Sequence, residues 1–243
     1  MTDPPGLRMP MLAIELSQRS GGVAVVDEAG HESVVPVTGG RREKDELLPA
    51  VREALESANV LARDLATVAV DVGPGGFTGL RISIAAAQAL AEVSGGVIVG
   101  VPGAEVAVAS TPACLDRALA GTIVVISATR NETAWATRFH RDHPEDDWVA
   151  VGRGDLIDAL PQERFAAVLA DEHLDPAWRA GLGEVGTPIL EPVHAATGLA
   201  RLLGRLRNAP PSSWHVSGDA ATLRPIYPRE PEAVRLWKAR PGR

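Results

Sequence analysis

The hydrophobic pattern of the first forty residues predicts three short β-strands. Apolar and β-branched residues run together at residues 11–16, 22–26 and 33–37, as they do in strands that are buried on at least one face. Residues 18–22 and 27–30, which separate these runs, contain the glycine and short polar side chains that favour tight turns. Because such short turns join antiparallel neighbours, we expect the three strands to form an antiparallel meander.

The next part of the chain alternates between helical and strand patterns. Residues 43–58 predict an amphipathic helix, since their apolar side chains recur at helical spacing. Its apolar stripe consists of Leu47, Leu48, Val51 and Leu55. A strand at 68–72, a small-residue helix at 78–93 and a strand at 97–101 then predict a βαβ unit. The order β-β-β-α-β-α-β is that of the ribonuclease-H-like half of the actin/Hsp70/sugar-kinase fold, one of several α/β folds that the pattern allows.

Beyond residue 112 the patterns weaken and predict a second, degenerate half of the same fold. Strands are expected at residues 122–126, 133–140, 148–151 and 165–169, and helices at 115–120 and 195–207. The expected division of the chain is a disordered leader at 1–8, an N-terminal lobe at 9–110, a C-terminal lobe at 111–229 and a tail at 230–243.

A glycine-rich loop lies between the first strand of the βαβ pattern, residues 68–72, and the helix that follows it in the chain. Gly73, Gly75 and Gly76 occur within four residues, and Thr78 stands where a helix N-cap is expected. Glycines permit positive φ and close backbone approach, and the free amides of a helix N-terminus favour an anion. The loop matches neither a Walker loop nor the Gly-x-Gly-x-x-Gly fingerprint. The residues alone therefore leave two interpretations open, a phosphate loop or a structural turn.

Composition narrows the class of protein. The chain has 243 residues, 45% of them hydrophobic, and a formal net charge of −7, which argues against binding a nucleic-acid backbone by itself. Its single cysteine, Cys114, excludes an internal disulfide and fits a reducing compartment. No signal peptide is recognisable, and no apolar run approaches the roughly 18 residues of a membrane span. We therefore expect a cytoplasmic protein that does not contact a membrane.

Several motifs together resemble those of one known family. The segment GPGGFTGLRI at residues 73–82 resembles the GPGSFTGLRIG motif of the TsaB (YeaZ) family. Four other segments resemble family motifs in the right order: LAIELS at 12–17 (LAIDTS), LLP at 47–49 (HxxxLLP), VGV at 99–101 with Glu105 (GVSSLEA) and PIYPR at 225–229 (PxYLR). The resemblance is strong from about residue 9 to residue 109 and thin afterwards.

The resemblance implies both a fold and a role. TsaB proteins have the two-lobed actin-like α/β fold and are the non-catalytic dimerisation subunit of the bacterial machinery that makes threonylcarbamoyladenosine in tRNA. Two of their helices build a four-helix bundle, either with a second copy or with the catalytic subunit TsaD, and the small ATPase TsaE docks on the assembled pair. For this chain the resemblance implies a homodimer when alone, indirect contact with tRNA, and no catalytic residue, cofactor or metal of its own.

The resemblance also assigns residues to two sites. The implied partner interface consists of Leu47, Leu48, Val51, Leu55, Leu80, Arg81 and Ile84. The implied vestigial phosphate loop consists of Glu15, Ser17, Gly73, Gly75, Gly76 and Thr78. In active members of the superfamily an Asp in the first strand helps to manage magnesium and phosphate, and Glu15 stands at that place. The pattern equally allows the two interface helices to pack inside their own domain.

Four departures from the family pattern identify a divergent member. Glu15 replaces Asp, Gly76 replaces Ser, Glu43 stands where a histidine usually leads the first helix, and Ser127 begins the segment that is commonly Asp-Ala-Arg. Each departure is compatible with the scaffold. Together they weaken the case for inherited small-molecule chemistry.

Three other chemistries are alternatives to the scaffold role: phosphotransfer, peptide hydrolysis and metal binding. The alternative is an active ATP-dependent phosphotransferase or ATPase, with Ser17 and the glycine loop on the phosphates and Glu15 or Asp71 as the magnesium carboxylate. A glycoprotease-like peptidase is disfavoured, because Cys114 has no sequence cue for an activating base and Ser17 has no Gly-x-Ser-x-Gly elbow. Residues 140–147 contain two histidines and several carboxylates without helical His-x-x-x-His spacing, which favours a solvated acidic loop over a metal site.

Overall fold

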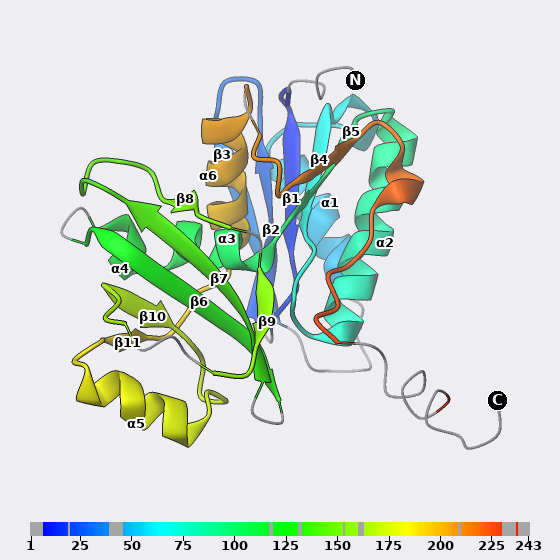
Figure 1. Cartoon of the computed structure of the whole chain (residues 1–243). Coiled ribbons are helices and arrows are strands. Elements are labelled where there is room, and N and C mark those ends of the chain that lie inside the picture. The colour runs from blue at the N-terminus through cyan, green and yellow to red at the C-terminus, as the bar shows by residue number, and fades with distance from the viewer. Residues whose placement is uncertain are drawn as a thin grey trace.

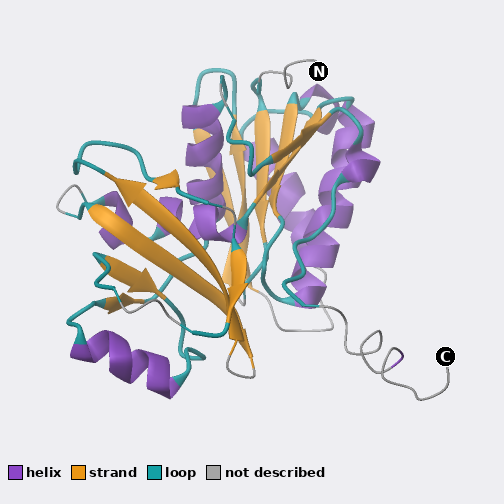
Figure 2. Cartoon of the chain, viewed as in Figure 1, coloured by secondary structure: helices purple, strands orange, loops and turns teal. Residues whose placement is uncertain are grey.

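The computed structural model of the chain describes residues 7–18, 20–38, 46–116, 119–130, 133–152, 154–159, 163–208, 210–229 and 237. In this part of the chain the strands form two mixed sheets, one in each of two α/β lobes (Figures 1 and 2). The first sheet has the order β12-β5-β4-β1-β2-β3 and the second the order β11-β10-β6-β7-β8, with β9 also paired to β7. The strands of the first sheet are β1 (Met11–Glu15), β2 (Ser20–Val26), β3 (Glu32–Thr38), β4 (Thr67–Asp71), β5 (Val97–Val101) and β12 (His215–Ser217). Those of the second are β6 (Gly121–Arg130), β7 (Thr133–Arg141), β8 (Val149–Ala150), β9 (Asp155–Ile157), β10 (Ala167–Leu169) and β11 (Ile189–Leu190).

The helices cover both sheets. They are α1 (Leu47–Ser57), α2 (Phe77–Ser94), α3 (Gly103–Ser110), α4 (Pro112–Leu115), α5 (Pro176–Glu184) and α6 (Ala196–Leu206), with short 3₁₀ turns at Ala62–Asp64 and Ala220–Thr222. Figure 1 shows α1 and α2 on one side of the first sheet, α6 on the other, and α5 against the second sheet. Helix α3 serves both lobes, since Val106 joins the core beneath α6 while Ala107 and Val108 join the core of the second sheet.

The topology of the first sheet confirms the predicted fold class. Strands β1, β2 and β3 pair antiparallel, as the short turns require, and β4 pairs parallel with both β1 and β5 across the α2 crossover. Adjacent side chains of a strand point to opposite faces of its sheet. Leu12 and Ile14 of β1 accordingly pack with α1 and α2, whereas Ala13 faces α6. Both faces of the first sheet are therefore buried, which explains why its central strands contain almost no polar residues.

In the linker between the lobes, one prediction is wrong and one helix was not predicted. A helix was expected at residues 115–120, but the helix present is α4, which ends at Leu115. The backbone carbonyls of Asp116 and Leu119 accept hydrogen bonds from the Arg141 guanidinium at 2.6 and 2.5 Å. Helix α3 was missed because Gly103 to Ala109 are all buried, so the segment has no polar face to reveal a helical period. Strands β9, β11 and β12 have two or three residues each, too few to show alternation.

Some predictions concern residues at the limits of the described structure. Leu7, expected in the leader, is buried, and its amide donates to the Arg207 carbonyl at 3.1 Å. Glu43 and the tail other than Trp237 lie outside the described residues. Ser127 lies in β6 opposite Trp135. Among the described helices, none combines the length and the apolar character that crossing a bilayer demands.

Candidate functional site

Helices α1 and α2 bury most of the side chains that the resemblance assigns to a partner interface. Five of the seven residues lie in the core of the first lobe: Leu47, Val51, Leu55, Leu80 and Ile84. Leu48 is 56% exposed and Arg81 is also exposed. The five buried residues hold the helices on the sheet and cannot form the outer surface of the chain as it stands. Of the seven predicted interface residues, Leu48 and Arg81 are therefore the two that face solvent.

An outer apolar face is present on these helices and on the segment that follows α1. We define this outer face as Leu48, Leu61, Phe77, Ile82 and Val93, whose exposed fractions range from 46% to 67%. Between α1, Leu61 and Leu90 of α2 runs a shallow groove of about 380 Å³. Leu48, Leu61 and Leu90 line this groove together, and neighbouring exposed apolar side chains are typical of protein-contact or ligand-binding surfaces.

An aromatic and cationic cluster lies at the N-terminal end of α2. The guanidinium carbon of Arg81 lies 3.9 Å from the centre of the Phe77 ring, and its Nε donates to the Tyr227 hydroxyl at 3.2 Å. The rings of Phe77 and Tyr227 are 5.8 Å apart between centroids. Tyr227 is held there because the neighbouring Ile226 amide donates to the Val72 carbonyl at 2.8 Å. Neither aromatic residue was predicted to belong to a site, although Phe77 lies in the GPGGFTGLRI motif and Tyr227 in the PIYPR motif.

The glycine loop packs against the chain's own backbone. The Gly76 amide donates to the Ser17 carbonyl at 2.7 Å, and the Gly73 amide donates to Asp71 Oδ1 at 2.6 Å. A Cβ on Gly75 would lie only 2.4 Å from the Ser17 carbonyl oxygen, so glycine is required for this close approach. Two of the amides that could have bound a phosphate are therefore already used, which favours the structural-turn interpretation.

The predicted cap of α2 is wrong. The N-cap is Gly76, in an extended conformation and without a side-chain hydrogen bond, and the helix begins at Phe77. Thr78 lies inside the first turn and is exposed. The observed N-cap lies two residues before the predicted one, so the helix begins directly after the glycine run.

A pair of buried carboxyl groups lies at the ends of two neighbouring parallel strands. Glu15 ends β1 and Asp71 ends β4, and both side chains are inaccessible to solvent. Glu15 Oε1 accepts from the Ser17 amide and hydroxyl, both at 2.7 Å, whereas Glu15 Oε2 and Asp71 Oδ2 have no other partner. Burial raises the pKa of Glu15 well above its usual range, and the adjacent Asp71 carboxylate raises it further. A single proton held between the two groups satisfies both remaining oxygens.

His194, from the second half of the chain, is close enough to Asp71 to be influenced by its charge. Its imidazole lies near Asp71 and hydrogen-bonds to the backbone of Gly103, and burial lowers its pKa despite the nearby carboxylates of Asp71 and Asp171. The side chain is therefore neutral at neutral pH. A Cβ on Gly103 would lie 3.1 Å from both Asp71 carboxyl oxygens. Two carboxyl groups beside a neutral imidazole give the site a negative potential, which opposes the binding of phosphate.

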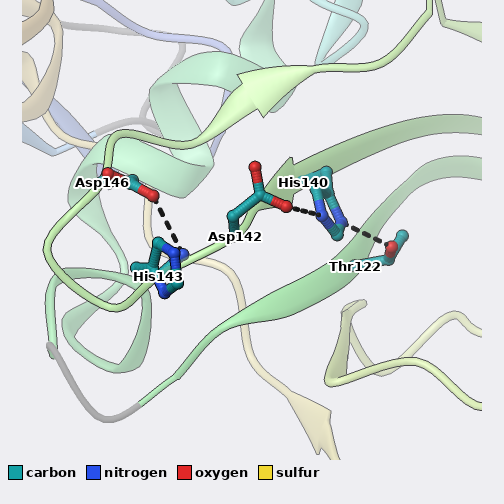
Figure 3. Close-up of polar contacts among 5 residues, drawn as sticks. All are labelled: Thr122, His140, Asp142, His143 and Asp146. Carbon is teal, nitrogen blue, oxygen red and sulfur yellow. Dashed lines mark hydrogen bonds and ion pairs between the residues drawn. The ribbon is translucent and has the colours of Figure 1, made fainter.

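The remaining reactive side chains have structural surroundings. Cys114 is buried, and burial raises the pKa of its thiol to about 11, so it is not a thiolate at neutral pH. Figure 3 shows the His140 ring between Thr122 and Asp142, with contacts of 3.0 and 3.2 Å, whereas His143 contributes its backbone amide to Asp146. In the described ranges, no group of three or more His, Cys, Asp or Glu side chains is arranged to hold a metal ion.

Comparisons with known proteins agree with this architecture. The family model for TsaD, tRNA N6-adenosine threonylcarbamoyltransferase, matches residues 24–150. An uncharacterised protein of Mycobacterium tuberculosis is 36% identical over 196 residues, covering 81% of this chain and 79% of the relative. A protein of Mycobacterium leprae is 29% identical over 227 residues, covering 92% of this chain but 55% of the relative. This chain therefore spans about half the length of the latter protein.

Among solved structures, YeaZ from Pseudomonas aeruginosa aligns with a TM-score of 0.67 at 19% identity, covering 90% of this chain and all of the other. At that identity the alignment establishes the fold alone. The matched family model and the mycobacterial relative establish the kinship. The chain is thus a divergent member of the TsaD-like family. It has the two-lobed actin-like fold of YeaZ.

Proposed function

We propose that this chain is a TsaB-type scaffold subunit, which binds a TsaD-type catalytic subunit and has no catalytic residues of its own. The observation that carries the proposal is the outer apolar face of α1 and α2. About half of each of these side chains is exposed to water, so the isolated chain leaves this apolar surface uncovered. A partner that covers them removes apolar surface from water, which is the main driving force of association.

The shape of this face suits a second pair of helices. Ala85 and Ala89 are exposed on α2 between the larger apolar residues, and small side chains allow another helix to approach closely. The cluster of Phe77, Arg81 and Tyr227 adds the residue types that most often carry binding energy at interfaces. These features support a four-helix contact formed by two helices from each subunit, which the resemblance to TsaB proteins implies.

The chemistry of tRNA threonylcarbamoylation then belongs to the partner. In the described structure the Gly76 and Gly73 amides donate to Ser17 and Asp71, and the buried carboxyl groups of Glu15 and Asp71 lie next to this loop. The formal net charge of −7 supports indirect contact with tRNA. A TsaE-type ATPase would join only the assembled pair.

The proposal also predicts two oligomeric states, a homodimer of this chain and a heterodimer with the TsaD-type subunit. Without its partner the chain covers the outer face with a second copy, and the TsaD-type subunit replaces that copy. Size-exclusion chromatography with light scattering, for the chain alone and mixed with TsaD from the same organism, tests this exchange. Ile82→Arg is the informative variant, since Ile82 is 46% exposed whereas the neighbouring Ile84 is buried. Val185→Arg, at the equally exposed end of α5, is the matched control.

We expect the wild type and Val185→Arg to exchange a homodimer for a heterodimer, and Ile82→Arg to do neither. A wild-type monomer that ignores TsaD would overturn the proposal. Saturable magnesium-ATP binding that is lost in Glu15→Ala would favour the phosphotransferase instead.

A further inference from the structure

A second cavity lies far from the outer apolar face, on the opposite side of the first sheet. It has a volume of about 860 Å³ and is bounded by α3, α4 and α6 together with the loop between β7 and β8. Its walls are mainly apolar, with Val108, Phe139, Trp148, Leu202 and Leu206 among them. This volume and this mixture of apolar walls with a few polar groups are typical of small-molecule sites.

A fixed carboxyl group lines the cavity. Glu105 of α3 is only 7% exposed, and its two oxygens accept hydrogen bonds from the Ser213 hydroxyl at 2.6 Å and the Trp214 indole nitrogen at 2.5 Å. Both donors are neutral, so they orient the carboxyl group without cancelling its charge. Each carboxylate oxygen can accept a further hydrogen bond. Burial raises the pKa of Glu105, as expected for a carboxyl group that lacks a neighbouring cation.

The two arginines of the cavity are engaged by the protein itself. Arg205 of α6 forms an ion pair with Asp147 of the β7–β8 loop, which ties the loop to the helix at the cavity mouth. Arg141 lies over the Trp148 ring, 4.3 Å from its centre, and donates to the backbone carbonyls of Asp116 and Leu119. Glu145 and Asp146 also line the cavity. Glu145 and Asp146 are exposed, so the buried carboxyl group of Glu105 is the one that favours a positive charge inside the cavity.

We propose that this cavity binds a small organic cation, namely a primary ammonium group on an apolar or aromatic body. The ammonium group would donate to Glu105, and the body would lie against Phe139, Trp148 and Leu202. The ammonium group supplies the positive charge that the neutral Ser213 and Trp214 donors lack. The apolar part of the ligand covers the cavity walls and so removes them from water. This site does not involve the α1–α2 surface and stands independently of the proposed scaffold role.

Two probes of equal shape and opposite charge test the inference. Tryptamine and indole-3-acetate share the same aromatic body, and titration calorimetry with the full chain measures the affinity of each. We expect tryptamine to bind saturably and at least tenfold more tightly than indole-3-acetate. Equal affinity for both probes, or a preference for the acid, would overturn the inference, as would the failure of tryptamine to bind.

Two variants locate the binding. Glu105→Gln keeps the shape of the side chain but removes its charge, so the preference for tryptamine should disappear. Leu206→Trp fills the cavity from a half-buried position on α6 and should abolish tryptamine binding even if Glu105→Gln fails to fold. Val185→Trp, outside the cavity, is the control and should bind as the wild type does. Undiminished binding in Leu206→Trp would place the probe elsewhere and refute the site.

Discussion

The two halves of the segment from Asp71 to Ile82 lie in opposite surroundings. In the first half, Gly75 and Gly76 are in close contact with the backbone of Ser17, which follows β1, and the Gly73 amide donates to Asp71. In the second half, Phe77 and Ile82 point outward and are about half exposed. The first half is explained by the packing of this chain alone. The exposure of Phe77 and Ile82 is not, and this is why the proposed partner contact includes them.

The same contrast occurs between neighbouring residues of α1. Leu47 is buried in the core, whereas Leu48, one position later, is exposed. Adjacent positions of a helix are about 100° apart around its axis, so two leucines in sequence take opposite roles. Two residues of one family motif can therefore have different roles. Their exposure shows which of them is free to contact a partner.

The strongest effect is expected from a substitution in the inward half. In Gly75→Ala the new Cβ would lie 2.4 Å from the Ser17 carbonyl oxygen, so the loop or β1 must move. We expect the free energy of unfolding in urea to fall by about 3 kcal/mol. Gly204→Ala, where the space around the glycine is open, is the control and should stabilise α6 by about 0.5–1 kcal/mol. A Gly75→Ala protein as stable as the wild type would show that the loop is not packed as described.

The leucine pair of α1 gives the next largest effect. Leu47→Ala removes a core side chain and should lower the free energy of unfolding by about 3 kcal/mol. Leu48→Ala should change it by no more than about 0.5 kcal/mol. The affinity for TsaD, measured by calorimetry, should fall about fivefold in Leu48→Ala, as for an interface residue worth about 1 kcal/mol. If Leu48→Ala bound TsaD as tightly as the wild type, Leu48 would lie outside the interface.

The buried carboxyl pair gives a pH-dependent effect. The pKa of Glu15 is raised in the folded chain, so its contribution to stability is fully present below the unfolded pKa of about 4.3 and is lost as pH rises through the folded pKa. Glu15→Gln can donate to Asp71 and accept from Ser17 at every pH. We expect it to be more stable than the wild type at pH 8 by about 1–2 kcal/mol, with the difference shrinking toward acid pH. Unfolding curves measured from pH 5 to 8 that stay parallel for both proteins would contradict the shared proton, and Glu56→Gln on the surface is the control.

The smallest effect concerns the cap of α2. Gly76→Ser restores the residue of the family motif, and its Cβ would lie 3.5 Å from the Ser17 carbonyl oxygen, which is an ordinary contact. A serine at the N-cap can accept a hydrogen bond from the first turn, so we expect a gain of a few tenths of a kcal/mol, about 0.3. Thermal unfolding of Gly76→Ser and of Gly75→Ala, measured side by side, compares the two neighbouring glycines. A loss of stability as large as that of Gly75→Ala would be evidence against the described loop geometry.

The first lobe could be predicted from the sequence to a considerable extent. Strands β1 to β5 and helix α2 lie within two residues of the expected positions, because alternation, turn residues and small-residue runs all indicate the same elements. The linker and the second lobe could be predicted less well. Helix α3 is apolar on every side, and β9, β11 and β12 are too short to leave a pattern.

The candidate sites required the tertiary structure. No polarity pattern distinguishes Leu47 from Leu48, since both are leucines within a single helical turn. The proximity of Glu15 and Asp71 follows from the parallel pairing of β1 with β4, which the sequence predicted only as part of a fold class. Tyr227 reaches Arg81 from 146 residues away, a contact that no local signal reveals.

Amide hydrogen exchange of the chain, alone and mixed with TsaD from the same organism, tests the central claim most directly. The account predicts that TsaD slows exchange in residues 47–57 and 77–94 and leaves the second sheet unchanged. Protection confined to the second lobe, or no protection anywhere, would contradict a partner surface on α1 and α2.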